Sequence, residues 1–192
     1  MPRPIMRLAK ELKEAQTNPD PDIHLELYDP HKQPTPTPAH ALSPSDYGDD
    51  GPTLPPLSSG SHDNLFTWLA VLQGPPDTPF EGGSYRLLLR VPRDYPMIPP
   101  TAHFLTRVFH PNVSFADGAV CLDILKTRWS PAWTLNSVCR AILNLMAEPD
   151  SDSPFNCDAG NLMRANDKEG YTSMVRMYAI MDAGAPPFKD EI

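Results

Sequence analysis

The chain has 192 residues, of which 40% are hydrophobic, and it carries a formal net charge of −8 at pH 7. Its length fits one globular domain with a tail or a large insertion, and its acidity argues against nucleic-acid binding and against attachment to anionic lipid by charge alone. No apolar run approaches the roughly 18 to 20 residues that cross a bilayer, and neither end carries a secretory or Ser-Lys-Leu address, so we expect a soluble protein of the cytosol or nucleus.

The first predicted element is a helix over residues 5–16, which ends at Thr17, Asn18 and Pro19. Its apolar face carries Ile5, Leu8, Leu12 and Ala15. Arg7, Lys10 and Lys13 form a basic side. A solvated face and a docking surface for a partner explain these charges equally well.

Four short strands are predicted next. They cover residues 23–28, 65–72, 84–92 and 101–106. In the second of them, Trp68, Ala70 and Leu72 share one face, and the third alternates in the same way. The last three are joined by short turns, and this spacing favours an antiparallel meander.

The segment between the first two strands has a different composition. Eight prolines fall between Pro30 and Pro56, mixed with Thr, Ser, Gly and Asp. Such a segment buries too little apolar surface to offset the entropy lost on ordering. We therefore expect one domain over residues 1–192, with a proline-rich insertion at about 30–62.

The second half of the chain predicts three helices. Thr134 can cap a helix that runs to about Ala147, and the apolar residues of that helix point nearly all round, so it should be buried. Residues 158–166 and 168–184 predict two closing helices. Helices segregated from an antiparallel sheet make an α+β domain.

The three cysteines are widely spaced, which suggests neither a disulfide framework nor a zinc site. Cys139 lies within the buried helix and is expected to act as a small core residue. Cys157 stands at a loop–helix junction, and the sequence assigns it no function. Cys121 follows Gly118 in an irregular segment, where a side chain can be presented to a partner.

The neighbours of Cys121 in sequence are Val120, Leu122 and Asp123, which do not activate a thiol as a base or a cation does. This setting suits a carrier that accepts an acyl group from another thioester and holds it. Asn112 could donate an amide N–H to the oxyanion when that thioester is attacked, or could tie down the loop, or both. Asp123 or Asp152 could help to desolvate and orient an attacking amine.

The stretch "FHPNVSFADGAVCLDI" (residues 109–124) resembles the active-site signature of ubiquitin-conjugating enzymes. The resemblance extends over "GPPDTPFEGGSYRLLLRVPRDYPMIPP", "WSPAWTL", "EPDSDSP" and "MRLAKEL", and so over nearly the whole chain except residues 30–62. It implies the ubiquitin-conjugating (UBC) fold: an N-terminal helix, a four-stranded meander, a buried central helix and C-terminal helices.

The resemblance also implies roles for individual residues. Cys121 would carry ubiquitin as a thioester, His110 and Asn112 would organise the site, and Ser153 stands at the family's gate position, where a hydroxyl would orient rather than deprotonate. The partner-binding residues implied are Met97, Pro131 and Ala132 for a RING-type ligase, and Arg7 and Lys10 on the first helix. No cofactor or metal is expected.

Within the family, "CLDILKTRWSPAWTL" and "DSPFNCDAGNLMRANDKEGY" resemble the peroxisomal branch most. This implies ubiquitin, its activating enzyme, a RING-type ligase and a membrane-anchored peroxin as partners. It places the protein peripherally on the cytosolic face of the peroxisomal membrane, where it would modify the import receptor for recycling. The alternatives are a general cytosolic carrier of ubiquitin or a ubiquitin-like protein, a cysteine hydrolase that uses Cys121 with His110 and Asn112, and an inactive binding module.

Overall fold

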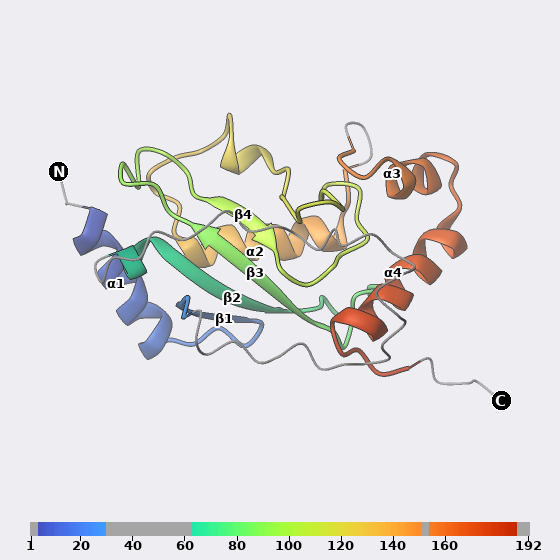
Figure 1. The fold of residues 1–192 in the computed structure, drawn as a ribbon, viewed down its shortest axis with the longest axis horizontal. Helices are drawn as coiled ribbons and strands as arrows, with labels where there is room; N and C mark the ends of the chain where they lie inside the picture. The colour runs from blue at the N-terminus through green and yellow to red at the C-terminus, as the bar shows by residue number, and fades with distance from the viewer. Residues whose placement is uncertain (1–3, 30–62, 151–153, 188–192) are drawn as a thin grey trace, which may run out of the picture.

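The computed structural model describes residues 4–29, 63–150 and 154–187. Its helices are α1 (Pro4–Thr17), α2 (Leu135–Ala147), α3 (Cys157–Arg164) and α4 (Lys168–Asp182), with short 3-10 helices η1 (Asp63–Phe66) and η2 (Asp123–Leu125). Its strands are β1 (Ile23–Leu27), β2 (Thr67–Gln73), β3 (Ser84–Arg90) and β4 (Thr101–Phe104) (Figure 1). The proline-rich insertion expected at about 30–62 lies outside the described residues.

The strands form one antiparallel sheet in the order β1-β2-β3-β4, which confirms the predicted meander. Leu27 pairs with Trp68 where β1 meets β2, so the two ends that flank residues 30–62 lie side by side. In the next pair Gln73 faces Ser84, and in the last Leu87 faces Phe104. Each strand is therefore joined to its spatial neighbour.

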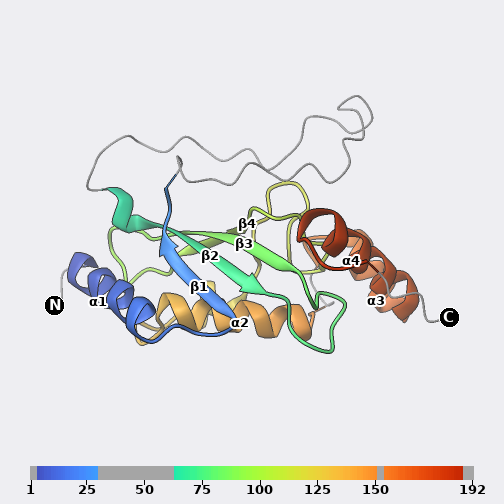
Figure 2. The ribbon, with the colours of Figure 1, turned by 90° about the horizontal axis from the view of Figure 1, so that it is seen from below.

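The core lies between the sheet and α2. Figure 2 shows α2 against one face of the sheet, with α1 at one end and α3 and α4 at the other. The predicted inner face of β2 is confirmed, because Trp68, Ala70 and Leu72 are fully buried. The Trp68 indole N–H donates to the carbonyl of Leu65 at 2.9 Å, so the one polar group of this side chain is satisfied.

Helix α2 begins as its sequence predicts, but it is not buried all round, because Asn144 and Ala147 are exposed and Leu145 is half-buried. The side chain of Thr134 accepts a hydrogen bond from the Ser137 N–H at 3.1 Å, and the Ser137 hydroxyl accepts one from the Thr134 N–H at 2.8 Å. This reciprocal cap is worth about 1 kcal/mol. The buried residues of α2 are Leu135, Val138, Cys139, Ile142, Leu143 and Met146.

The apolar face expected for α1 is only partly correct. Leu8 is fully buried, but Ile5 is 51% exposed. The helical period predicts which face of the helix a side chain lies on. How much of that face is buried depends on the segments that pack against it. Ile5 falls beyond that extent.

A buried carboxylate joins α1 to two distant segments. Glu11 accepts hydrogen bonds from Arg7 at 2.6 Å, from the Tyr95 hydroxyl at 2.8 Å and from the Leu135 N–H at 2.8 Å. Burial, reinforced by the Glu11 charge, raises the pKa of Tyr95. The carboxylate also faces the N-terminus of α2, whose partial positive charge favours it. Arg7 additionally donates to the carbonyl of Trp133 at 3.1 Å, so α1 is fastened to the loop that precedes α2.

Candidate active site around Cys121

A glycine turn brings Cys121 to the edge of the sheet. Gly118 has φ of +70°, and a Cβ at this position would overlap the carbonyl oxygen of Phe104, so both conformation and space require glycine. Beyond the turn, Val120 pairs with Val113, and the Cys121 N–H donates to the Asn112 carbonyl at 2.9 Å. Two residues nine positions apart are therefore adjacent, and the thiol is held half-exposed at the surface.

A lysine that the sequence argument overlooked contacts the thiol. Lys126 Nζ donates to Cys121 Sγ at 2.9 Å and lies 5.2 Å from the centroid of the Phe155 ring. The η2 turn causes this, because the Leu125 N–H donates to the Leu122 carbonyl and the chain folds back toward the cysteine. The immediate sequence neighbours of Cys121 thus gave no sign of the cation that the fold places beside its thiol. The signal in the sequence that could have indicated this contact was a lysine five residues after the cysteine, in an irregular segment.

The Asn112 side chain ties down the loop that follows α2. It is 4% exposed. Its Nδ2 donates to the Asp150 carbonyl at 2.7 Å, and its Oδ1 accepts from the Asp150 N–H at 2.9 Å. The structural role considered for Asn112 is thus observed. An amide NH2 has two N–H groups, so one of them is engaged by Asp150 and the second is the one that would serve an oxyanion.

His110 organises the same segment from inside the protein. The side chain is fully buried, its Nδ1 accepts from the Asn112 N–H at 3.0 Å, and its Nε2 therefore carries the proton that it donates to the Leu145 carbonyl at 2.9 Å. Burial lowers the pKa of His110 to about 4, so the ring is neutral at physiological pH. With both ring nitrogens engaged, His110 is not placed to act as a base for Cys121, which argues against the cysteine-hydrolase alternative.

A family model described as ubiquitin-conjugating enzyme matches residues 51–179. The chain belongs to this family. It is therefore a transferase that works with ubiquitin, an activating enzyme and a ligase. The predicted family, the α+β class and the UBC fold are confirmed.

Similar proteins support the assignment. Protein PEROXIN-4 of Arabidopsis thaliana is 57% identical over 120 residues, which cover 62% of this chain and 76% of that protein. The ubiquitin-conjugating enzyme E2 pex4 of Dictyostelium discoideum is 53% identical over 115 residues, covering 60% and 77%. Among solved structures, a putative ubiquitin conjugating enzyme from Plasmodium yoelii matches with a TM-score of 0.72 at 27% identity, covering 97% of this chain and 99% of that chain.

The other residues predicted for the site are Asp123, Asp152 and Ser153. The Asp123 carboxylate is 70% exposed and lies 3.8 Å from Arg128 Nε. Ser153, predicted as the gate residue, and Asp152 fall outside the described residues. Hydrogen bonds therefore connect Cys121 to Asn112 and Asn112 to His110. Lys126, which was not predicted for the site, contacts the Cys121 thiol.

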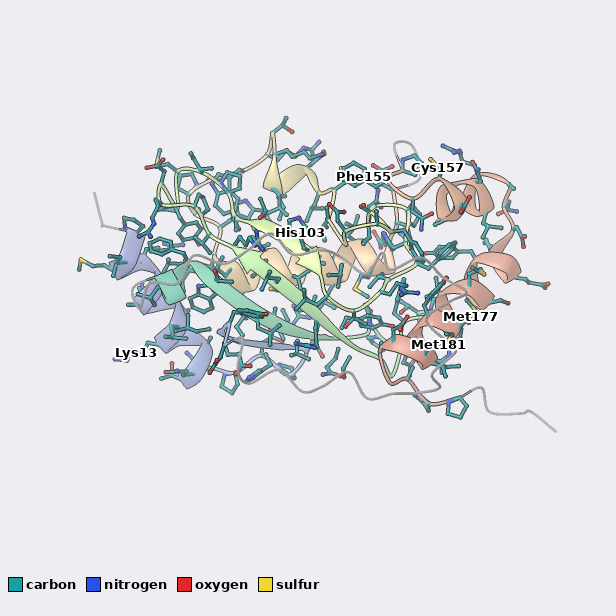
Figure 3. All side chains as sticks on the ribbon, viewed as in Figure 1. Lys13, His103, Phe155, Cys157, Met177 and Met181 are labelled. Carbon is teal, nitrogen blue, oxygen red and sulfur yellow. The ribbon has the colours of Figure 1, made fainter. Side chains whose placement is uncertain are left out.

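The other two cysteines differ in environment. Cys139 is fully buried in α2, as predicted, and burial raises the pKa of its thiol. Cys157 is exposed and is the first residue of α3, beside Phe155 (Figure 3). Because its thiol is buried, Cys139 cannot accept an acyl group from another protein. Cys157 is exposed and is therefore the control against which the role of Cys121 is tested.

The predicted ligase-binding residues lie on two loops that are joined to each other. The Trp129 indole N–H donates to the Pro96 carbonyl at 2.8 Å, which links the loop of Met97 to that of Pro131 and Ala132. All three predicted residues are exposed, Met97 by 62%. On α1, Lys10 is exposed. The half-buried guanidinium of Arg7 instead donates hydrogen bonds within the protein, to Glu11 and to the Trp133 carbonyl.

The described part of the enzyme shows neither a metal-ligand cluster nor a membrane-spanning helix. Within residues 4–29, 63–150 and 154–187, no three His, Cys, Asp or Glu side chains gather as metal ligands would. In the same ranges, no helix combines the length and the apolar character that a bilayer span needs.

Proposed function

We propose that Cys121 accepts ubiquitin as a thioester from the activating enzyme and, with a RING-type ligase, passes it to a substrate at the peroxisome surface. The observation that carries the chemistry is the position of this thiol. It is half-exposed, fixed by its own backbone to Asn112, and contacted by an ammonium group. A cation stabilises the thiolate, which is the form that attacks.

The transfer needs little activation at its first step. Exchange between two thioesters breaks and forms the same kind of bond, so its free energy is close to balanced. At the second step an amine attacks, and charge develops on the carbonyl oxygen. An N–H aimed at that oxygen is worth about 3 to 4 kcal/mol, and we assign this role to the second N–H of Asn112. Asp123 is exposed beside the loop and can orient the incoming amine.

The peroxisomal part of the proposal rests on the relatives. Proteins named PEROXIN-4 and pex4 share 57% and 53% identity with the matched regions of this enzyme. We propose that it modifies the matrix-import receptor so that the receptor can be recycled, and that a membrane-anchored peroxin holds it on the cytosolic face of the membrane. The alternative is a general carrier without a fixed location.

Helix α4 is our choice for part of the anchor-binding face. Met177 and Met181 are 39% and 44% exposed, while Val175 and Ala179 are buried against the core. Figure 3 shows both methionines on α4, at the opposite end of the enzyme from Lys13 of α1. An anchor bound there would leave α1 free. If the enzyme still sediments with peroxisomes in cells that lack the anchor, this recruitment is wrong.

The carrier role is tested by incubating the enzyme with activating enzyme, ATP and ubiquitin. Wild type should form an adduct that thiol reagents remove. Cys121→Ser should form an ester that resists them, because an oxygen ester does not exchange with thiols. Cys157→Ser is the matched control and should behave as wild type. A thiol-sensitive adduct on Cys121→Ser would show that another cysteine is the carrier.

A further inference from the structure

The residue assigned to the oxyanion lies midway between two phenylalanines whose rings contact the same tyrosine. Asn112 is three residues after Phe109 and three residues before Phe115. The Tyr178 ring of α4 lies 6.1 Å from the Phe109 ring and 5.4 Å from the Phe115 ring, measured between centroids. We propose that Phe115 is a positioning residue for transfer, which holds this segment so that the second N–H of Asn112 faces the thioester. This inference rests on the carrier role and the oxyanion role proposed above.

The three rings contact one another in pairs. Phe109 and Tyr178 are stacked, with an angle of 11° between their ring planes. Phe115 stands edge-on to both, at 73° to Tyr178 and at 80° to Phe109, and its centroid is 6.4 Å from that of Phe109. Stacked and edge-to-face pairs at such distances attract each other beyond the effect of the apolar area that they bury. This aromatic clasp of Phe109, Phe115 and Tyr178 therefore joins α4 to both ends of the segment that carries Asn112.

Phe115 is the member of the aromatic clasp that can be changed without opening the core. Its side chain is 43% exposed, whereas that of Phe109 is 5% exposed. The Arg107 guanidinium lies over the Phe115 ring, 5.9 Å from its centroid, which is within the range of a cation–π contact. The ring is thus held in place at the surface by α4 on one side and by a cation on another.

Asn112 and Cys121 lie on the two arms of one hairpin, and the arms are supported differently. The arm that leads to Cys121 is bonded to β4, since the Val120 N–H donates to the Ala102 carbonyl at 3.0 Å. On the arm that follows Asn112, the contact with α4 is made by the Phe115 ring. Loss of this ring would leave the arm of the thiol supported, but it would take from the arm of the amide its link to α4.

The effect of such a loss should fall on transfer rather than on charging. Charging requires an accessible thiol, and the thiol does not depend on the aromatic clasp. Attack by an amine requires the N–H of Asn112 to be aimed at the oxyanion, and a misplacement of about 1 Å can cost about a hundredfold in rate. Because two hydrogen bonds to Asp150 still hold the Asn112 side chain, the loss should be smaller than on removal of the amide itself.

The experiment measures single-turnover discharge of the charged enzyme to free lysine, with no ligase present. The variants are Phe115→Ala, Phe115→Tyr, which keeps the ring, Asn112→Ala, and the double variant Asn112→Ala with Phe115→Ala. The control is Ile5→Ala, because the Ile5 side chain is 51% exposed but lies on α1, at the opposite end of the molecule from α4 (Figure 1). Thermal melts set an assay temperature at which every protein is folded. If Phe115→Ala does not fold, Phe115→Leu takes its place, because it keeps apolar bulk but has no ring edge.

We expect Phe115→Ala to charge to the wild-type level and to discharge about tenfold more slowly. Phe115→Tyr should recover most of the wild-type rate, and Ile5→Ala should discharge as wild type does. The double variant should discharge no more slowly than Asn112→Ala, because a side chain that acts through the amide has no effect on transfer once the amide is gone. A side chain that served stability alone would lower the melting temperature and leave the discharge rate unchanged.

Three outcomes have different consequences for the proposals. A normal discharge rate of Phe115→Ala, or a double variant about tenfold slower than Asn112→Ala, overturns this inference alone. A normal discharge rate of Asn112→Ala overturns the oxyanion role and this inference with it. Failure of wild type to form the thiol-sensitive adduct overturns the carrier function as well.

Discussion

Replacing Asn112 with Ala should separate the structural contribution of this side chain from its contribution to transfer. The change removes the hydrogen bonds of 2.7 and 2.9 Å to the backbone of Asp150. Because Asp150 is exposed, water can replace part of what is lost, and each bond is then worth about 1 kcal/mol. The free energy of unfolding should fall by about 2 kcal/mol, which for a protein of this size lowers the melting temperature by about 4 to 8 °C.

The kinetic effect should be larger than the structural one. If the second N–H of Asn112 stabilises the oxyanion, discharge of the thioester to an amine should slow by about a hundredfold. Charging should remain nearly normal, because thioester exchange places less demand on that donor. Asn112→Asp sharpens the comparison: its carboxylate can still accept from the Asp150 N–H but has no N–H to donate. Its second oxygen, however, takes the place of Nδ2 and faces the Asp150 carbonyl, so two acceptors repel each other in a buried place. Asn112→Asp should therefore be less stable than Asn112→Ala and should discharge as slowly.

The assay is single-turnover discharge of the charged enzyme to free lysine, measured beside a thermal melt. Asn144→Ala is the control, because Asn144 is exposed on α2 and alanine favours the helix there. An unchanged melting temperature for Asn112→Ala would contradict the structural reasoning from Asp150. A normal discharge rate would remove Asn112 from the mechanism.

Three other predictions follow from the fold and the site. Replacing residues 30–62 by a short turn should preserve the melting transition and the charging of Cys121. The reason is that β1 and β2 are already paired at their ends, and the free energy of loop closure depends only weakly on loop length. Loss of charging would show that the segment is needed. The pKa of His110 is about 4 in the folded protein and about 6.5 in the unfolded chain. Between these pH values the unfolded chain binds more protons than the folded protein does. The free energy of unfolding should therefore fall by about 2 kcal/mol from pH 7 to pH 5. His103, whose pKa is also lowered by burial, acts in the same direction, so the test is whether His110→Gln flattens the pH dependence of the melting temperature; an unaltered slope would refute it. Met97→Ala should weaken the stimulation of discharge by a RING-type ligase. It should leave charging by the activating enzyme intact, since the Met97 side chain is exposed. Equal stimulation of the variant and wild type would exclude Met97 from the ligase surface.

The elements of this fold were predictable because their signals are local. The alternation of Trp68, Ala70 and Leu72 requires only that a strand has one buried face, and the structure buries all three. Thr134 caps α2 through atoms three residues away, so its role is contained in a short window of sequence. Cys121 was identified by its place after Gly118 and by the family resemblance of the surrounding stretch, both of which are properties of consecutive residues.

The contacts that define the site depend on segments far apart in the chain, or on the path of an irregular loop. Asn112 binds Asp150 across 38 positions, and Glu11 binds Leu135 across 124, so no window of sequence contains either pair. Lys126 is close to Cys121 in sequence, but the hydrogen bond between them exists only because the η2 turn folds back. Helical and strand periods describe regular backbone, and they give no direction for a side chain in such a turn. Sequence thus determined the elements and the candidate thiol, whereas tertiary structure decided which amine, amide and imidazole surround it.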